Sequence, residues 1–314
     1  IRETAEYDAA AALITLKAWD RAAAVLEGFR RDHPDSRYAG DVTQKLAVAY
    51  LESGRGLDAA RELERVGDNT AADETIRREA LWKAAELYGE GGRTGEEAVL
   101  LERIVEHYPR PVAESVEALA RLLELAEARG DRHGRTALLR EIVRADAGAG
   151  SERTDRTRYL AAKASLALAE PAQSRFMAVA LTQPLADSLA LKKQRMEAVL
   201  AAYGKAADYG VAEVTTAATF HLGEVYRQFA RDLMDSERPP DLDAEALAQY
   251  ALLLEEQAFP FEEKAIELFE ANAARAAAGV YDEWVRRSFA ELAKLVPARY
   301  AKLERSEDVV TALY

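Results

Sequence analysis

Histidine is the side chain most often used for proton transfer and metal binding near neutral pH, and this chain contains four. His33 and His107 stand just before helix-ending prolines, so packing at a corner explains both. His133 lies in a glycine-containing turn. His221 precedes Glu224 by three residues, a spacing that can place both side chains on one face of a helix. Only this last pair has the spacing of a ligand pair.

A metal site built on His221 would need ligands from other helices. A carboxylate-bridged di-iron bundle uses Glu-x-x-His motifs from two helices together with two more glutamates. Here the order is reversed and no second copy exists. We therefore predict a structural pair and no metal. A metal-binding helical enzyme is the alternative, and it requires His221 to converge with the glutamates at 255–263.

The other common catalytic patterns are missing from the sequence. Cysteine is absent, which excludes disulfides, thiolate metal sites and cysteine nucleophiles. No Gly-x-Ser-x-Gly motif occurs, and the glycines of GEGGRTG at 89–95 stand between two helical patterns with no preceding strand. We predict no catalytic residues, no cofactor and no enzymatic activity.

Charge and composition narrow the class of partner. The 55 acidic and 42 basic side chains give a formal charge of -13, which disfavours nucleic acid. No apolar run approaches the roughly 18 residues that cross a bilayer, so we predict no transmembrane segment. Because the sequence starts at Ile1 within a helical pattern, we expect a fragment from which a signal peptide, a lipid anchor or further repeats have been removed.

A helical pattern repeats along the first half of the chain. Three apolar residues and a proline between 98 and 109 each stand 75 residues after counterparts between 23 and 34, which is two periods of 37 or 38. LLERIV at 100–105 and LLREIV at 138–143 are 38 residues apart. We predict four helical hairpins over residues 1–147. Seven of the predicted helices are 5–17, 20–32, 40–53, 57–66, 74–88, 112–128 and 135–145, and the eighth lies between the glycine turn at 89–95 and Pro109.

The second half, residues 148–314, is less regular. The small and polar residues of 146–155 predict a linker, and prolines predict helix ends. We expect Asp241 or Asp243 to cap a helix, the FPF triplet at 259–261 to form a corner, and 298–314 to be short helix and loop. The predicted helices are 157–170, 172–182, 185–208, 211–235, 244–257, 262–277 and 281–296.

The repeating hairpins resemble the tetratricopeptide repeat. Small residues stand where helices cross, aromatic residues near helix ends, and a proline follows the second helix. The positions that carry the resemblance are Ala22, Leu26, Phe29 and Pro34, followed by Leu46, Ala47, Tyr50 and Ala59. The resemblance implies an all-α, right-handed α-α superhelix, a solenoid that continues into a C-terminal region of longer helices.

One string, FRRDHPDSRYAGD followed by KLAVAYLESGR, resembles the bacterial cell-envelope branch of that family. That branch includes an outer-membrane assembly lipoprotein and a periplasmic Tol-associated coordinator. This resemblance implies a periplasmic or outer-membrane-associated scaffold. The second half, with LLEEQAFPFEEKAIEL and LVPARYAKLE, resembles the C-terminal part of large tetratricopeptide proteins of the proteobacterial envelope, some of which belong to gene neighbourhoods with motor proteins. Together the two resemblances imply a partner from an envelope motor or an outer-membrane complex. A cytoplasmic adaptor that binds regulatory peptides is the alternative.

Two surfaces are candidates for binding a protein or peptide. The first is the inner groove of the superhelix, where first-helix positions offer apolar contact ringed by carboxylates; they are Tyr7, Gln44, Val48, Trp82, Glu86, Ala120 and Glu124. Because the groove lacks the Lys and Asn set of a carboxylate clamp, a basic or amphipathic helix fits it better than a C-terminal peptide. A purely structural Trp82 is the competing interpretation.

The second surface is acidic and aromatic and lies near the C-terminus. Nine acidic residues stand between 241 and 275 against two basic ones. Its members are Glu255, Glu256, Phe259, Phe261, Glu262 and Glu263. A solvated helix face is the simpler interpretation. The functional one is a docking site for a basic partner, in which the aromatic residues anchor and the carboxylates orient.

Overall fold

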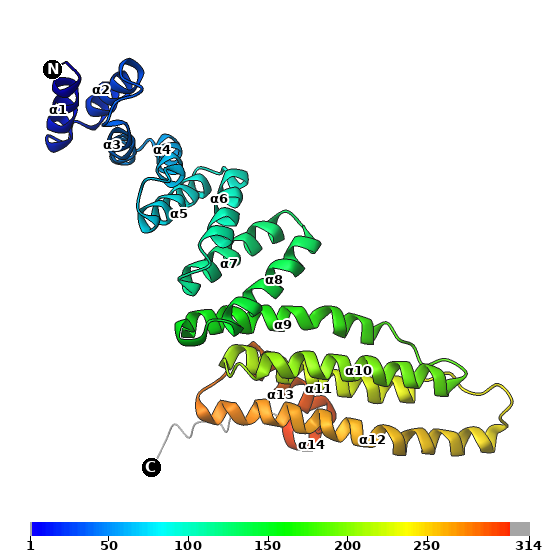
Figure 1. Cartoon of the computed structure of the whole chain (residues 1–314). Helices are drawn as coiled ribbons and strands as arrows, with labels where there is room; N and C mark the ends of the chain where they lie inside the picture. The colour runs from blue at the N-terminus through cyan, green and yellow to red at the C-terminus, as the bar shows by residue number, and fades with distance from the viewer. Residues whose placement is uncertain (1, 302–314) are drawn as a thin grey trace, which may run out of the picture. The chain divides into compact units, whose positions relative to one another are not determined.

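The computed structural model describes residues 2–301, and this part of the chain is helical with no strand (Figure 1). Its contacts form two compact units, Ile1–Thr157 and Arg158–Tyr314, called unit 1 and unit 2. No helix within 2–301 combines the length and apolar character needed to span a bilayer. The all-α class predicted from the sequence is confirmed.

Unit 1 consists of helical hairpins that follow one another in series (Figure 1). Each helix contacts the helix before and after it, as in a solenoid. The helices are α1 (Arg2–Thr15), α2 (Trp19–Asp32), α3 (Ala39–Glu52), α4 (Gly56–Asp68), α5 (Glu74–Glu90), α6 (Thr94–His107), α7 (Val112–Ala128) and α8 (Arg132–Ala147).

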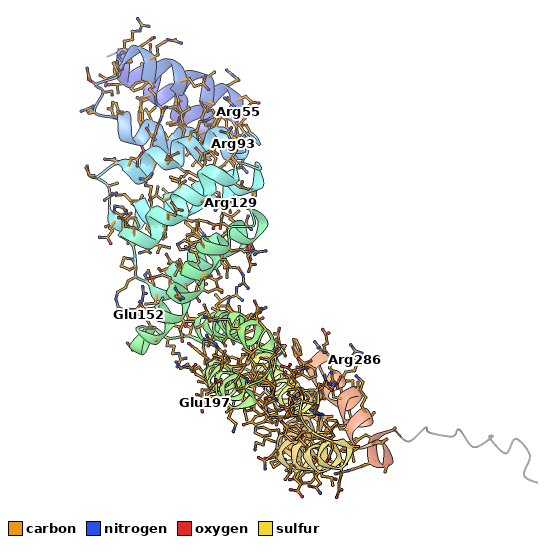
Figure 2. All side chains as sticks on the ribbon, turned by 90° about the vertical axis from the view of Figure 1, so that its right-hand side faces the viewer. Arg55, Arg93, Arg129, Glu152, Glu197 and Arg286 are labelled. Carbon is orange, nitrogen blue, oxygen red and sulfur yellow. The ribbon has the colours of Figure 1, made fainter. Side chains whose placement is uncertain are left out.

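The same turn closes each hairpin of unit 1. Gly54, Gly92 and Gly130 have φ of 76°, 71° and 69°, and Lys17 occupies the equivalent place with φ 54°. The next residue donates its N–H to a carbonyl five residues back, for example Arg93 to Tyr88 at 2.8 Å. At the end of the first helix of each hairpin the chain thus adopts a left-handed conformation. A Cβ strains this conformation, which explains the recurring glycine. Figure 2 shows the turn residues Arg55, Arg93 and Arg129 following one another along one side of unit 1.

Small residues let the helices of unit 1 approach closely. Ala22, Ala59 and Ala84 are fully buried, and they surround larger core residues such as Leu26 and Phe29. Neighbouring hairpins are also joined by hydrogen bonds from tyrosine to glutamate. The Tyr50 hydroxyl donates to Glu27 at 2.6 Å and the Tyr88 hydroxyl to Glu64 at 3.0 Å.

Residues 146–155 are more ordered than a linker. Asp146 is buried, accepts a hydrogen bond from Thr157 at 2.8 Å and forms an ion pair with Arg153. Within the 3-10 turn Gly150–Glu152, Glu152 accepts a hydrogen bond from the backbone N–H of Val112 at 3.0 Å. These contacts tie the segment to the start of α7.

Unit 2 is built mainly from long helices that lie lengthwise beside one another (Figure 1). Antiparallel packing is marked by the hydrogen bond from Asn272 to the carbonyl of Thr216. The helices are α9 (Asp155–Met177), which starts at the end of unit 1, α10 (Leu185–Ala207), α11 (Ala212–Met234), α12 (Ala244–Ala274), α13 (Glu283–Leu295) and α14 (Pro297–Tyr300). The part of the predicted C-terminal tail beyond residue 301 lies outside the described residues.

Two predicted helix ends in unit 2 are wrong. Pro171 lies inside α9, and Pro260 lies inside α12, so 259–261 forms no corner. Both prolines are exposed, and the apolar stripe of α12 continues beyond Pro260 through Ala265 and Phe269. Water can replace the one hydrogen bond that a proline removes at such a position, while burial of the stripe holds the helix together. Asp243 caps α12, as the sequence allowed.

The core of unit 2 includes one lysine. Lys192 of α10 is 0% exposed, and its Nζ donates to the carbonyls of Phe176 and Val179 at 2.9 and 2.8 Å. The same atom lies 2.6 Å from Asp232 of α11. Lys192 thus satisfies carbonyls at the end of α9 and joins it to two other helices.

Candidate functional site

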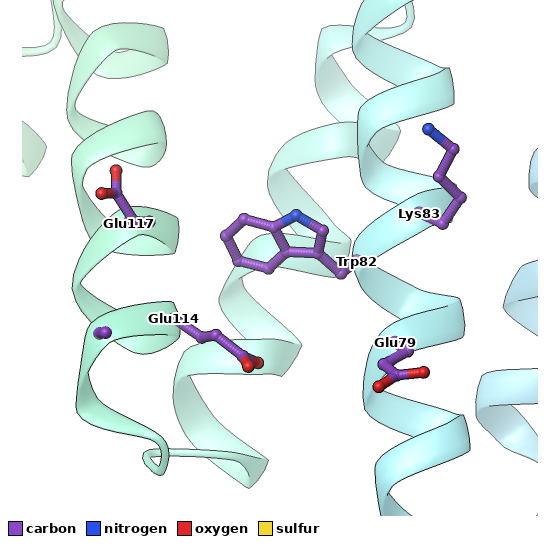
Figure 3. A pocket seen from close by; sticks show the side chains of 6 residues that line it. Glu79, Trp82, Lys83, Glu114 and Glu117 are labelled. Atoms are coloured by element: carbon purple, nitrogen blue, oxygen red, sulfur yellow. The ribbon is translucent and has the colours of Figure 1, made fainter.

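A pocket of about 510 Å³ opens between α5 and α7, the first helices of the third and fourth hairpins of unit 1. Figure 3 shows the indole of Trp82 projecting from α5 toward α7, which carries Glu114 and Glu117. The lining residues are Glu79, Trp82, Lys83, Ala113, Glu114 and Glu117. We call this the Trp82 pocket.

Trp82 is half-buried, with one part of the ring against the core of unit 1 and another facing the pocket. Its Nε1 donates to Glu86 one turn later at 3.1 Å. That hydrogen bond satisfies the polar edge and leaves the apolar face of the indole for contact.

Three charged pairs surround the Trp82 pocket. Arg78 Nε lies 2.8 Å from Glu114, and Arg156 Nε donates to Glu117 at 2.6 Å. On the α5 side, Lys83 Nζ donates to Glu86 at 2.8 Å, and this hydrogen bond raises the pKa of Lys83 above its usual value. The carboxylates at these positions are therefore largely neutralised.

Glu79 is the exception among the lining carboxylates. It is exposed and has no hydrogen bond or ion pair with any residue in the described range. It lies one turn before Trp82 on α5, so both side chains border the same opening (Figure 3). The pocket thus offers an apolar ring with one uncompensated negative charge beside it.

The other predicted groove residues take several roles in the structure. Tyr7 stacks on Tyr38 with ring centroids 4.3 Å apart and donates to Asp41, so it joins the first two hairpins. Gln44 and Val48 are exposed on α3. On α7, Ala120 is half-buried and Glu124 accepts from Arg121 at 2.7 Å. Of the seven predicted residues, only Trp82 lines the pocket itself, with Glu86 bonded to it.

Two lining residues that were not predicted, Glu79 and Glu117, could have been identified from the spacing of the repeat. Glu79 and Glu117 are 38 residues apart, as are Trp82 and Ala120, so the repeat places them at equivalent positions on α5 and α7. They lie three residues before the predicted positions, on the same helix face. Arg156, which pairs with Glu117 but does not line the pocket, has no such signal, because it belongs to the irregular part of the chain.

The acidic and aromatic surface is only partly formed as predicted. Glu255, Glu256, Glu262 and Glu263 are exposed on α12, and Phe259 is 57% exposed. Phe261 faces the core instead, where its ring lies 4.4 Å from that of Phe229. A helix that continues through Pro260 places residues 259 and 261 about 200° apart around its axis, which explains the difference.

Two of the four histidines, His33 and His221, lie in packed or paired positions. His133 is exposed, as is His107, whose Nδ1 lies 3.1 Å from the carbonyl of Arg103 in its own helix, so the corner packing expected for His107 is wrong. His221 stacks on Tyr203 with centroids 5.0 Å apart, and its Nδ1 lies 3.2 Å from Glu224. His33 Nε2 lies 3.0 Å from Glu6, which joins α1 to the end of α2. Residues 2–301 contain no group of three or more His, Asp or Glu side chains placed to share a metal ion. His221 and the glutamates at 255–263 therefore form no common site.

Comparison with known proteins supports the repeat. Residues 79–110, which include Trp82, match the family model described as tetratricopeptide repeat. Comparison with curated proteins gives no significant match. Among solved structures, the chain is similar to a tetratricopeptide repeat protein from Parabacteroides merdae ATCC 43184, at 14% identity and a TM-score of 0.36. That alignment covers 93% of this chain and 98% of the other.

Proposed function

We propose that this chain, with its tetratricopeptide-type hairpins, is a non-catalytic scaffold that holds a protein or peptide partner on the face formed by α1, α3, α5 and α7. Tetratricopeptide repeats typically bind proteins or peptides, and the match over 79–110 begins within α5 and includes Trp82. The Trp82 pocket is the anchor point of this proposal.

The observation that supports the proposal is the combination of an accessible indole face with one unpaired carboxylate. Trp82 gives a large apolar contact at little cost in conformational entropy, as binding hot spots do. Glu79 favours a lysine or arginine near the group that contacts the indole. We therefore expect a ligand with an apolar side chain and, about one helical turn away, a basic one.

Selection from a random peptide library on the whole protein tests this proposal. Selected peptides should share an apolar residue and a basic residue about one turn apart. Trp82→Ala should weaken their binding at least about tenfold, as expected for loss of a central anchor. Glu79→Gln should weaken it less and should reduce its dependence on salt concentration.

Val99→Ala is the control, because Val99 is an apolar residue 53% exposed on α6, outside the proposed face. It should leave binding unchanged. Selected peptides that bind wild type and Trp82→Ala equally well would show that this pocket is not the anchor.

We further propose that the scaffold works in the bacterial cell envelope, at the periplasm or outer membrane, with a partner from an envelope motor or an outer-membrane complex. The support for the location is the resemblance of residues 29–41 to the envelope branch of the family, and the support for a motor partner is the resemblance of the second half to large envelope proteins of that family. Fractionation of cells that express the full-length gene product tests the location, and recovery in the cytoplasm would favour an adaptor for regulatory peptides instead.

A further inference from the structure

The outer face of α12 carries apolar side chains that no described part of the chain covers. Leu252 is 61% exposed, and Leu253 and Phe259 are each 57% exposed. The buried stripe of α12 includes Leu254, Ala258, Ala265 and Phe269 and points to the core of unit 2. The exposed residues lie on another side of the helix, because successive residues turn by about 100°.

The exposed residues form a stripe with a regular spacing. Leu252, Glu256, Phe259 and Glu263 follow the i, i+4, i+7, i+11 pattern of a single helix face, and we call them the α12 stripe. Leu252 and Phe259 are two turns apart, or about 10 Å along the axis. A straight row of this kind matches the ridge of another helix better than an extended strand.

The carboxylates of the α12 stripe and its flank are not compensated. Glu255, Glu256, Glu262 and Glu263 make no hydrogen bond or ion pair with any residue in 2–301. Lys264, the one basic residue within α12, donates to Glu267 at 2.7 Å instead. Elsewhere in the chain, glutamates at helix surfaces commonly pair with an arginine three residues away, as Glu141 does with Arg144 and Glu124 with Arg121. Four like charges within nine residues repel one another.

We propose that the α12 stripe is a docking surface for a basic amphipathic helix of a protein partner. Leu252 and Phe259 supply the apolar contact, and the four glutamates pair with lysine or arginine at the edges of the partner's apolar face. The uncompensated negative charge selects this occupant. A second copy of the chain would bring a second set of the same carboxylates, and an anionic lipid surface would be repelled.

This surface is separate from the Trp82 pocket, which belongs to unit 1. The two proposals rest on different residues, so substitutions can remove either surface without changing the other. Loss of one binding activity with retention of the other identifies which proposal has failed.

A synthetic helix tests the proposal with a defined probe. The probe is an 18-residue fluorescent peptide with leucines along one face and lysines elsewhere, titrated into the whole protein and followed by anisotropy. Leu252→Ser with Phe259→Ser should weaken binding at least about tenfold. The Gln variant at positions 255, 256, 262 and 263 should also weaken it and should abolish most of its salt dependence.

Three controls make the result specific. Met177→Ser with Leu191→Ser removes two exposed apolar residues of unit 2 outside α12, and binding should persist. Because the same kind of peptide suits the Trp82 pocket, the titration is repeated in a Trp82→Ala background, where Leu252→Ser with Phe259→Ser should still weaken binding at least about tenfold. A peptide of the same composition, scrambled so that its leucines no longer share a face, should bind at least about tenfold more weakly. Circular dichroism of each variant should match wild type.

Several outcomes would overturn the proposal. Equal binding of the probe to wild type and to the Leu252→Ser, Phe259→Ser variant would place the probe elsewhere. Equal binding of the scrambled peptide would reduce the effect to charge alone. Self-association of the wild type that the same double variant abolishes would identify a second copy as the occupant. Binding to phosphatidylglycerol vesicles that depends on Leu252 and Phe259 would identify a membrane.

Discussion

Lys17 stands where the other hairpins of unit 1 have glycine. Its φ of 54° lies in the left-handed region, which costs an L-residue about 1–2 kcal/mol. Glycine at Gly54, Gly92 and Gly130 avoids this cost. The first hairpin therefore contains a strained residue that its neighbours lack.

Replacing Lys17 with glycine should stabilise the protein. We expect a gain of about 0.5–1 kcal/mol in the free energy of unfolding, because the relief of strain exceeds the extra entropy of glycine in the unfolded chain. Gly92→Lys is the reciprocal variant and should lose a similar amount. Urea unfolding of both variants measures the change, and a destabilised Lys17→Gly would refute the strain.

Ionisation of the Tyr88 hydroxyl should lower the free energy of unfolding at alkaline pH. Burial and the hydrogen bond to Glu64 raise the pKa of Tyr88 to about 12. Since the unfolded value is about 10, the neutral form's contribution is complete below pH 10 and is lost as the pH rises through 12.

The variant Tyr88→Phe isolates this contribution. It should cost about 1 kcal/mol at pH 8, where the hydrogen bond is lost, and its stability should then fall less steeply than that of wild type between pH 10 and 12. Denaturant unfolding at several pH values gives both numbers. Parallel curves for the two proteins across that interval would show that Tyr88 does not titrate as described.

At the scale of helices, α11 and α12 pack closely because Gly223 has no side chain. A Cβ added to Gly223 would lie 2.7 Å from the ring of Phe269, which is fully buried. Gly223→Ala should therefore destabilise the protein by about 1–3 kcal/mol through overpacking.

Gly204 provides the matched control for Gly223. It lies inside α10, and a Cβ there would meet no atom within 4 Å. Gly204→Ala should stabilise the protein by about 0.5–1 kcal/mol, because alanine favours the helix. Thermal unfolding of the two variants should give shifts of opposite sign. Shifts of the same sign would mean that the close approach at Gly223 does not govern its effect.

Helix positions were predictable where periodicity and turn residues agree. The predicted helix 112–128 coincides with α7, between Pro111 and the turn at Gly130. Pro171 and Pro260 misled the prediction because a proline signal is local. Whether a helix continues past it depends on the packing of the residues beyond, such as Phe269, and on whether the proline faces water.

The site was predictable in part for the same reason. The 37–38-residue period identifies the face of the first helices, and Trp82 is its one large aromatic side chain at the third hairpin. The pairing that leaves Glu79 as the one uncompensated carboxylate of the pocket was not predictable, because it depends on Arg78 and Arg156 and on which carboxylate each reaches. Phe261 was misplaced because the phase of α12 depends on its continuity through Pro260.

At the scale of the whole molecule, each unit has a core cluster made of its own residues. The largest core cluster of unit 1 contains residues between Ala10 and Leu125, while the clusters around Phe229 and Phe269 belong to unit 2. We expect denaturant to unfold the two units in distinct steps.

Single-tryptophan variants should resolve these steps. Trp82 reports on unit 1 and Trp284 on unit 2, once the remaining tryptophans are changed to phenylalanine. Phe229→Ala should lower the stability of unit 2 by about 3–5 kcal/mol and should shift only the Trp284 transition. An equal shift at Trp82 would show that the two units unfold as one.

The recurring left-handed turn bears on how such a chain can change in length. Leu46 and Leu63 are 17 residues apart across one turn, and Leu122 and Leu139 are 17 apart across another, while the difference between periods of 37 and 38 falls in loops between hairpins. A residue inserted within a helix would rotate the rest of that helix by about 100° about its axis and turn carboxylates toward the core. Duplication of an entire hairpin would keep each later side chain on its original face, so growth by copying is tolerated where growth by single insertions is not.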